Sequence, residues 1–261
     1  MIVEDLKRKS VLITGSGRGI GRAIALAFGA QGADVVVTGR TQAGLDAVAQ
    51  EIRGRGAKAL ALTCDVTRKE EVEVLEHEIA SRLGAVQVLV NNAGIAPAAG
   101  FMEMEDRLWE EVLKVNLTGT YNCCKVFLPG MIASGWGRII NIASTVSKVV
   151  YSHISAYATS KHAVLGLTRS LAVEMAQSGV TVNAVCPGYV DTDLTRKNAS
   201  SLAERRGTTV EQALDYFKGT SPQRRLIDPD EVAHLTVMLA SEAAKGITGQ
   251  AINVDGGAVM T

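Results

Sequence analysis

The sequence predicts an α/β domain built on a doubly wound parallel sheet of seven strands, with helices on both faces. Short β-branched runs alternate with longer segments of helical periodicity, and the order strand, helix, strand implies right-handed crossovers between parallel strands. The runs are apolar throughout, as in Val35-Val36-Val37 and Val88-Leu89-Val90, which is typical of strands covered on both faces. A length of 261 residues suits one such domain with a large core.

Each predicted element follows from its local pattern. Strands are predicted at 10–14, 34–38, 59–64, 86–90, 138–143, 180–185 and 251–254. Helices are predicted at 22–31, 42–53, 69–83, 107–134, 156–178 and 230–240. No linker or repeat divides the chain, so 1–261 is predicted to be a single domain.

One stretch, 191–228, interrupts the alternation of strands and helices. It is polar in its middle and carries an amphipathic piece at 210–217. Such a stretch is either a surface excursion or a helical flap over a bound molecule, since long loops in compact domains often act as lids. We refer to residues 191–228 as the insert.

Composition argues against several classes of function. Lys plus Arg equals Asp plus Glu, at 27 each, so no overall field favours nucleic acid or an anionic membrane surface. The four cysteines form no C-x-x-C pair and the four histidines are scattered, which predicts neither a disulfide framework nor a metal site. No apolar run approaches the roughly 20 residues of a membrane helix. We expect a cytoplasmic protein with reduced thiols.

A glycine-rich turn follows the first predicted strand and opens the first helix. It comprises Gly15, Ser16, Gly17, Arg18, Gly19, Ile20 and Gly21. Glycines let the backbone approach a pyrophosphate, and the helix N-terminus supplies amide donors and partial positive charge. A plain tight turn would also account for the glycines, but their place after an N-terminal strand favours a Rossmann-like dinucleotide site.

The end of the second strand distinguishes NADP from NAD. A site for NAD usually places an acidic residue there, about 20 residues after the glycines, to hold the ribose 2′-hydroxyl. Here the strand ends Thr38-Gly39-Arg40, without an acid. Arg40 and Arg18 could both hold a 2′-phosphate with forked, charge-assisted hydrogen bonds, so NADP is predicted and NAD is disfavoured. The alternative is that both arginines are simply solvated.

With these motifs, the chain resembles the short-chain dehydrogenase/reductase family over essentially its whole length. Three further motifs agree in order and spacing: Cys64-Asp65-Val66, Asn91-Asn92-Ala93-Gly94, and Pro187-Gly188-Tyr189-Val190-Asp191-Thr192. The resemblance implies that Asp65 and Val66 contact the adenine and that Asn92, Ala93 and Gly94 line the cofactor. It also implies that Pro187 and Gly188 belong to the cofactor site, with Val190 and Thr192 at the nicotinamide amide.

The candidate catalytic pair is Tyr157 and Lys161, which are four residues apart and so lie on one face of a predicted helix. A phenol has a pKa near ~10, and a neighbouring ammonium or oxidised nicotinamide would favour its ionised form. Tyr121 and Lys125 have the same spacing. What singles out the first pair is Ser144, just after a strand and thirteen residues before Tyr157.

The resemblance assigns roles to the remaining candidates. Ser144 takes the position of the family's donor to the substrate oxygen, and Tyr157 and Lys161 also contact the cofactor. Asn116 matches the residue that holds a water linking Lys161 to solvent. The four residues together imply a ketoreductase that interconverts a ketone and a secondary alcohol.

The substrate is less sharply defined by the sequence. Resemblance in the segment 181–188, at Lys148 and His153 and in the insert favours reductases of 3-oxoacyl thioesters, with polyketide ketoreductases and 3-hydroxybutyrate dehydrogenases having inserts of similar length. The substrate could be carried on coenzyme A or an acyl carrier protein. Basic side chains near the insert could meet its phosphate, or could be ordinary surface charges; they are Arg196, Lys197, Arg205 and Arg206.

Three hypotheses remain: an NADPH-dependent ketoreductase, an oxidative secondary alcohol or 3-hydroxyacyl dehydrogenase, and a catalytically inactive nucleotide sensor. Arg40 argues against an NAD-linked oxidative enzyme, and the complete set of four catalytic residues argues against the sensor. The resemblance also implies a homotetramer assembled through the helices at 107–134 and 156–178.

Overall fold

The computed structural model describes residues 4–261, which form an α/β domain around one seven-stranded parallel sheet. The strands are β1 (Ser10–Thr14), β2 (Asp34–Gly39), β3 (Ala59–Thr63), β4 (Val88–Asn91), β5 (Gly137–Ile142), β6 (Val180–Pro187) and β7 (Ala251–Val254). Their order in the sheet is β3-β2-β1-β4-β5-β6-β7. The chain therefore changes direction across the sheet between β1 and β4, where open α/β sheets form a ligand crevice at the carboxyl ends of the strands.

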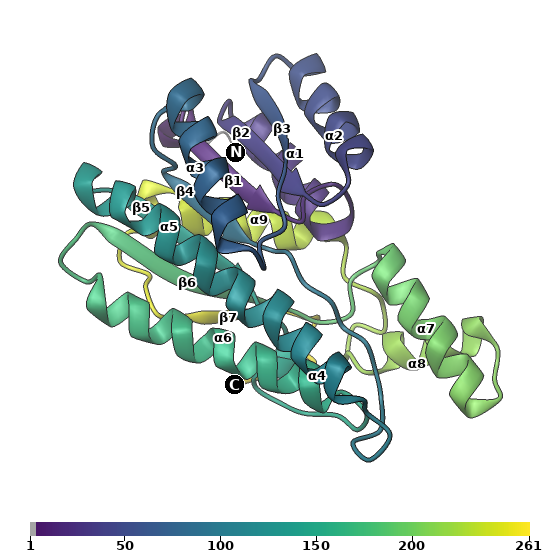
Figure 1. The fold of residues 1–261 in the computed structure, drawn as a ribbon. Helices are drawn as coiled ribbons and strands as arrows, with labels where there is room; N and C mark the ends of the chain where they lie inside the picture. The colour runs from purple at the N-terminus through teal and green to yellow at the C-terminus, as the bar shows by residue number, and fades with distance from the viewer. Residues whose placement is uncertain (1–3) are drawn as a thin grey trace.

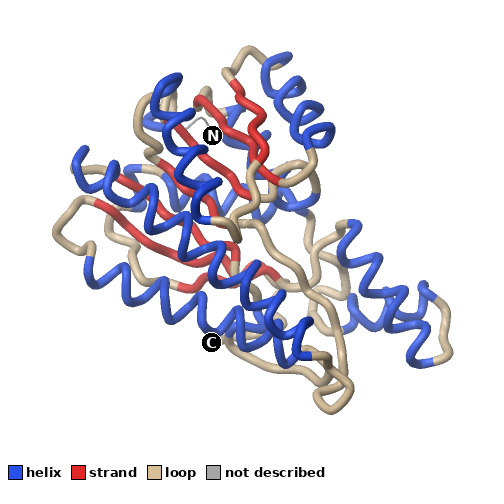
Figure 2. Tube along the Cα trace, viewed as in Figure 1, coloured by secondary structure: helices blue, strands red, loops and turns tan. Residues whose placement is uncertain are grey.

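Helices cover both faces of the sheet, as Figures 1 and 2 show. They are α1 (Gly19–Ala30), α2 (Gln42–Gly54), α3 (Lys69–Leu83), α4 (Asp106–Leu113), α5 (Gly119–Ser134), α6 (Ser155–Glu174), α7 (Asp193–Arg206), α8 (Val210–Gly219) and α9 (Pro229–Ala240). In the described part of the chain, no helix has the length and apolar character needed to cross a bilayer.

Alternate residues of each central strand enter different apolar clusters. Val11 and Ile13 of β1 pack on one face with the helices α1, α2 and α9. Leu12, between them, packs on the other face with α3 and α5. Both faces of the sheet are therefore dry, which accounts for strands that are apolar throughout.

The predicted fold class is confirmed, and most boundaries lie within two residues of the predicted ones, except that α1 begins three residues earlier and α6 ends four residues earlier. The largest difference lies in the predicted helix 107–134. It consists of α4, a π-helical turn η2 (Lys114–Thr118) and α5, with Asn116 inside the π turn. Side-chain periodicity does not reveal a single widened turn, because the apolar face continues across it.

The insert folds as a helical hairpin rather than as a loop with one amphipathic piece. Its helices α7 and α8 project beyond the carboxyl end of β6 (Figure 1). They enclose a small apolar cluster of their own, centred on Ala199, Leu202 and Phe217. A parallel bridge between Val190 and Ile227 closes the base of the hairpin.

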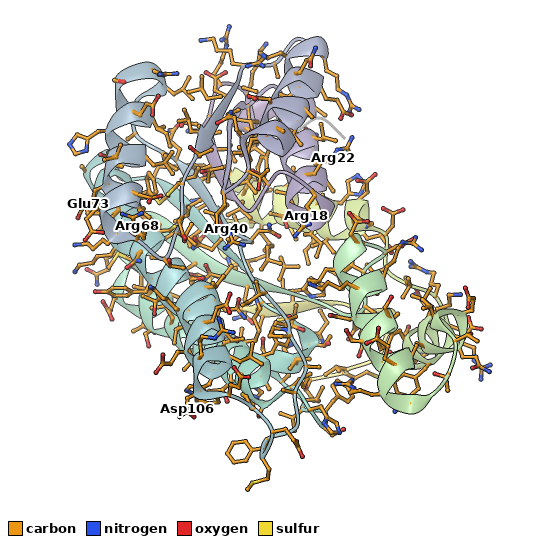
Figure 3. The ribbon with its side chains drawn as sticks, turned by 45° about the vertical axis from the view of Figure 1, so that its right-hand side comes forward. Arg18, Arg22, Arg40, Arg68, Glu73 and Asp106 are labelled. Carbon is orange, nitrogen blue, oxygen red and sulfur yellow. The ribbon has the colours of Figure 1, made fainter. Side chains whose placement is uncertain are left out.

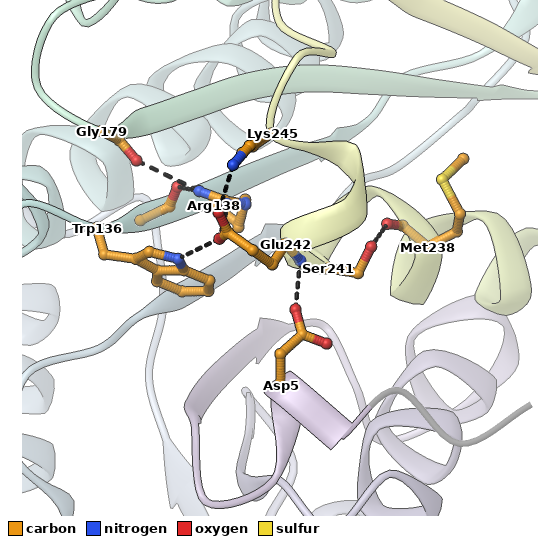
Figure 4. A network of polar contacts seen from close by, with 9 residues as sticks. Asp5, Trp136, Arg138, Gly179, Met238, Ser241, Glu242 and Lys245 are labelled. Atoms are coloured by element: carbon orange, nitrogen blue, oxygen red, sulfur yellow. Dashed lines mark hydrogen bonds and ion pairs between the residues drawn. The ribbon is translucent and has the colours of Figure 1, made fainter.

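A buried arginine holds the opposite end of the sheet together (Figure 4). Arg138, at the start of β5, is 2% exposed and donates to Glu242 Oε2 over 3.0 Å. Trp136 Nε1 donates to the same carboxylate oxygen, and the Arg138 guanidinium lies 4.3 Å from the Trp136 ring centroid. The backbone amide of Glu242 in turn donates to Asp5. This network is structural and lies away from the glycine-rich turn.

Candidate active site

The glycine-rich turn is packed so closely that side chains are excluded from its inner side. A Cβ on Gly21 would lie 2.5 Å from both Asn92 Nδ2 and the Gly15 carbonyl oxygen. Gly15 has φ +63°, and a Cβ there would lie 2.9 Å from the Cα of Ala93. Asn92 fastens the turn by donating from Nδ2 to Thr14 O and Gly15 O. The turn thus rests on the loop after β4, at the point where the chain changes direction.

The start of α1 offers donors for an anion. Its N-cap residue, Arg18, makes no side-chain capping hydrogen bond, so the first amides of the helix are left for another acceptor. Such amides, with the partial charge of the helix N-terminus, fit a pyrophosphate. Ser16 is not part of this surface: it is fully buried, donates to Ile13 O and accepts from the Thr38 amide.

Arg18 and Arg40 are exposed and come from the loops that follow the neighbouring strands β1 and β2 (Figure 3). Within residues 4–261 neither makes a salt bridge. Both guanidinium groups are therefore available at the edge of the glycine-rich turn. This arrangement fits a 2′-phosphate better than a 2′-hydroxyl, because no carboxylate stands at the end of β2.

Asp65 and Val66 lie in the loop after β3. The Thr67 amide donates to Asp65 Oδ1, and the Asp65 amide donates to Glu71. Partial burial raises the pKa of the Asp65 carboxyl, but the Thr67 hydrogen bonds and the nearby charge of Arg40 outweigh it, so the pKa is below its usual range. Val66 is buried and packs where Gly119 leaves no room for a Cβ.

Ser144, Tyr157 and Lys161 meet beyond the carboxyl ends of β5 and β6. Ser144 is buried at the N-cap of a short 3-10 turn, where its hydroxyl accepts from the Val146 amide. Tyr157 and Lys161 lie on α6, with the Lys161 ammonium nitrogen 5.8 Å from the centroid of the Tyr157 ring. Lys161 is 6% exposed and donates to Ile142 O over 2.7 Å.

Burial governs the proton affinities of this pair. It lowers the pKa of Lys161 to about 8. It raises the pKa of Tyr157, which a hydrogen bond with the Ser144 side chain lowers only in part. The Lys161 ammonium is directed to the Ile142 carbonyl, so desolvation sets the direction of the Tyr157 shift. That a neighbouring ammonium and an oxidised nicotinamide favour the phenolate stays a prediction. At neutral pH the phenol holds its proton.

Asn116, in the π turn, joins two segments of the chain through its side-chain hydrogen bonds. Its side chain accepts from the Ile95 amide over 2.8 Å and donates to Ile95 O and to Ser160 Oγ, each over 2.9 Å. Ser160 Oγ also donates to the Tyr157 carbonyl oxygen over 2.7 Å. Asn116 therefore connects the loop after β4, which includes Gly94, to the helix that carries Tyr157. Its expected water stays a prediction.

The segment after β6 brings the insert to the glycine-rich turn. A Cβ on Gly19 would lie 3.4 Å from Thr192 Cγ2, so Thr192 borders the turn. Val190 is buried at the base of the insert, and Gly188, after Pro187, lies against Asp255. Lys148, one of the residues that carry the resemblance to 3-oxoacyl thioester reductases, donates from its ammonium to the backbone oxygens of Ala251 and Thr261.

Other candidates fall outside this cluster. Tyr121 and Lys125, the second pair with the catalytic spacing, are exposed on the outer face of α5. His153 is exposed, with φ +66°. Of the four basic residues near the insert, Arg196 pairs with Asp191 and Arg206 lies over the Tyr216 ring. In the described chain, no group of His, Cys, Asp and Glu is arranged to hold a metal ion.

Tyr189, which follows β6 two residues after Pro187, belongs to the 187–192 motif but was not predicted to be a site residue. Its ring stacks on Phe217 of α8 with centroids 4.1 Å apart and planes 11° apart. Burial first, and then the nearby phenols of Tyr151, Tyr216 and Tyr157, raise the pKa of Tyr189 to about 12. Its position just beyond the carboxyl end of a central strand was the signal that could have identified it.

Comparisons with known proteins agree with this geometry. A family model described as enoyl-(acyl carrier protein) reductase matches residues 15–259. The chain is 40% identical over 255 residues to a D-beta-hydroxybutyrate dehydrogenase of Cupriavidus necator, covering 97% of this chain and 98% of that protein. It is 37% identical over 253 residues to a 3-oxoacyl-(acyl-carrier-protein) reductase of Staphylococcus aureus, with 97% and 98% covered.

A solved structure has the same fold. A crystal structure of an actinorhodin polyketide ketoreductase variant with NADPH superimposes with a TM-score of 0.93, at 39% identity, covering 98% of each chain. The superposition covers nearly the whole chain, and therefore the regions that contain the glycine-rich turn, the π turn, the Tyr157 helix and the insert.

Proposed function

Because the chain belongs to the short-chain dehydrogenase/reductase family and is an NAD(P)-dependent oxidoreductase acting on CH–OH groups, we propose that it is an NADPH-dependent ketoreductase. Its substrate would be a 3-oxoacyl thioester or a related β-keto compound. The observation that carries the proposal is the meeting of Ser144, Tyr157 and Lys161 beside a glycine-rich turn flanked by two arginines free of salt bridges within the described chain.

The residues of the chain manage the proton in this reaction. A reduced nicotinamide, when bound, supplies a hydride to the carbonyl carbon. Ser144 and Tyr157 hydrogen-bond the carbonyl oxygen, and Tyr157 gives its proton to that oxygen as negative charge develops. Lys161 then favours the resulting phenolate by its charge and, with solvent, restores its proton. Asn116 positions the loop after β4 and the helix α6 relative to each other through its hydrogen bonds with Ile95 and Ser160.

Reduction needs a protonated Tyr157, whereas oxidation needs its phenolate as base. The raised pKa of Tyr157 keeps the proton on the phenol at neutral pH, which suits the donor in the reductive direction. The second candidate is a 3-hydroxyacyl or other secondary alcohol dehydrogenase that works oxidatively with NAD(P). The likeness to a D-beta-hydroxybutyrate dehydrogenase favours it. Arg40 and the absence of an acid after β2 support NADP over NAD in either direction.

The relatives' names also bear on the substrate. A 3-oxoacyl chain and β-hydroxybutyrate both have a second oxygen two carbons from the reacting carbon. We propose such a compound here, carried on coenzyme A or an acyl carrier protein or supplied free. The insert would form a flap over it, since α7 begins beside the glycine-rich turn at Thr192.

A homotetramer built through α5 and α6 belongs to the same proposal. Large apolar side chains stand exposed on both helices, including Tyr121 and Ile132 on α5 and Val173 on α6, which is 78% exposed. Exposed apolar surface on helices is typical of an interface between subunits. Light scattering coupled to size-exclusion chromatography should give four times the 27.5 kDa chain mass.

The test is a cofactor and substrate panel followed at the nicotinamide absorbance band. We expect NADPH consumption with the N-acetylcysteamine thioester of 3-oxobutanoate, and a kcat/KM for NADPH at least about tenfold that for NADH. The reverse assay uses the corresponding 3-hydroxy compound with NADP⁺ and NAD⁺. Preference for NADH, or efficient turnover only of the alcohol at neutral pH, would favour the oxidative candidate.

A further inference from the structure

We infer that Tyr189 determines specificity: its phenol hydroxyl, fixed by the stack on Phe217, binds a second oxygen of the substrate. The site would then select ketones with another oxygen two carbons away over simple ketones. The inference rests on the proposed ketoreductase function and names what the substrate must have besides the reacting carbonyl.

The backbone of Tyr189 is held on both sides. The Ile227 amide donates to the Tyr189 carbonyl oxygen over 2.8 Å, and the Gly188 amide donates to Val254 O over 3.0 Å. Val190, the next residue, forms the parallel bridge to Ile227. Tyr189 therefore starts from a fixed point beyond β6. This strand pairs with β5, which leads into Ser144, so both residues lie at the same edge of the sheet.

The ring of Tyr189 is held by the insert. Phe217 is 5% exposed within the apolar cluster of α7 and α8, and its ring lies parallel to that of Tyr189. An offset stack at a centroid distance of 4.1 Å restricts rotation of both rings. The direction of the Tyr189 hydroxyl is therefore set before any substrate arrives.

The hydroxyl itself has no protein partner. Across residues 4–261, no side chain or backbone group forms a hydrogen bond with the Tyr189 hydroxyl. The hydroxyl oxygen is also not fully shielded from solvent. Tyr157 is among the groups that raise the pKa of Tyr189, so the two phenols lie near one another at this edge of the sheet. Tyr189 is partly buried, and a tyrosine whose ring is packed usually finds a partner for its hydroxyl. A ligand oxygen in the cleft would be that partner.

A neutral donor at this place suits a carbonyl acceptor. Ser144 and Tyr157 serve the ketone oxygen, which leaves Tyr189 for an oxygen farther along the chain. The thioester or ester carbonyl of a β-keto compound has that position, whereas a simple ketone has no second acceptor. A site whose donor stays unpaired with the wrong ligand discriminates against that ligand.

The experiment compares Tyr189→Phe with the wild type on two substrates. The variant keeps the stacked ring and loses only the hydroxyl oxygen. With NADPH, kcat/KM for the N-acetylcysteamine thioester of 3-oxobutanoate should fall about tenfold, while kcat/KM for cyclohexanone should change less than about twofold. Tyr216→Phe is the matched control, because Tyr216 is a neighbouring phenol outside the proposed contact, and it should leave both values unchanged.

Binding gives a readout independent of turnover. The NADPH-loaded protein cannot reduce the 3-hydroxybutanoyl thioester, so calorimetric titration with that product reports binding alone. Its dissociation constant should rise about tenfold in Tyr189→Phe and stay unchanged in Tyr216→Phe. Equal losses on both ketones, or an unchanged dissociation constant, would overturn the inference. If the wild type reduces neither ketone, the proposed function fails, and the calorimetric comparison alone decides the role of Tyr189.

Discussion

The glycine-rich turn and the insert border each other at Gly19 and Thr192, and they are built by different means. The turn is defined by backbone packing so close that a Cβ on Gly21 would overlap two neighbouring atoms. In the insert, a Cβ on Gly219 would meet nothing within 4 Å, and a small apolar cluster separate from the two main clusters holds the hairpin. Backbone geometry thus fixes the proposed cofactor side, whereas side-chain packing holds the proposed substrate flap together.

The largest expected effect lies at Tyr157, the proposed proton donor beside Ser144. Tyr157→Phe removes the proton donor and one donor to the developing oxyanion, and such a donor is typically worth about 3–4 kcal/mol. We therefore expect kcat to fall at least about 10³-fold in the NADPH-linked assay. The Tm should stay close to wild type, and NADPH binding should weaken far less than kcat falls, because the proposed phosphate-binding turn is untouched and Tyr157→Phe keeps the ring. A variant with wild-type kcat would discard the mechanism.

The second prediction tests the contrast between the sides directly. Gly21→Ala forces overlap with Asn92 and the Gly15 carbonyl, so we expect a loss of about 3 kcal/mol in the free energy of unfolding and at least tenfold weaker NADPH binding. Gly219→Ala, at the open end of α8, should be neutral or stabilising by up to about 1 kcal/mol. Urea unfolding and fluorescence titration measure both. Similar destabilisation by the two variants would contradict the proposed contrast.

The same contrast between backbone and side-chain packing explains which parts of the fold and of the candidate site could be predicted from the sequence. The seven strands, their helices and the turn at Gly15 to Gly21 were predictable, because apolar periodicity and glycines report directly on buried strands and close backbone approach. The spacing of Tyr157 and Lys161 likewise places them on one face of a helix. Their roles stay predictions, although the structure brings both to Ser144.

What was not predictable depends on single side-chain directions. Ser16 lies in the turn but points inward to Ile13 and Thr38, which a glycine motif cannot show. The π turn at Asn116 widens one turn without changing the apolar pattern. Tyr189 has the position of a site residue after a central strand, but its stack on Phe217 of α8 is not recorded in the sequence pattern. Each of these features depends on a side-chain direction or a local backbone geometry that apolar periodicity does not report.

The third prediction concerns Arg40 at the proposed cofactor side. Arg40→Ala should weaken NADPH binding about 10- to 100-fold, since a charge-assisted hydrogen bond is worth about 1.5–3 kcal/mol, and should leave NADH binding unchanged. Arg22→Ala is the control: Arg22 also lies near the turn but is paired with Glu51 over 2.5 Å. Fluorescence titration with both nucleotides measures the effect. Equal weakening of NADPH and NADH would show that Arg40 does not contact a 2′-phosphate.

The smallest expected effect concerns the base of the insert, which charges help to attach to α9. Arg225 forms two hydrogen bonds with Glu231, of 2.6 and 2.7 Å, and this lowers the pKa of Glu231 to about 2. The stabilisation is present above the unfolded pKa near ~4.3 and is lost as the pH falls toward 2. The pair is partly exposed, so solvent screening keeps its contribution small.

Glu231→Gln isolates that charge, because glutamine at this position can still complete the capping box with Asp228. At pH 7 we expect a Tm no more than about 2 °C below wild type. The gap should narrow below about pH 4.3 as the wild-type carboxylate is protonated. Differential scanning fluorimetry from pH 7 to 3 measures it. A gap that stays constant with pH would mean that the carboxylate charge does not attach the insert, which would then depend on its apolar cluster and the Val190–Ile227 bridge alone.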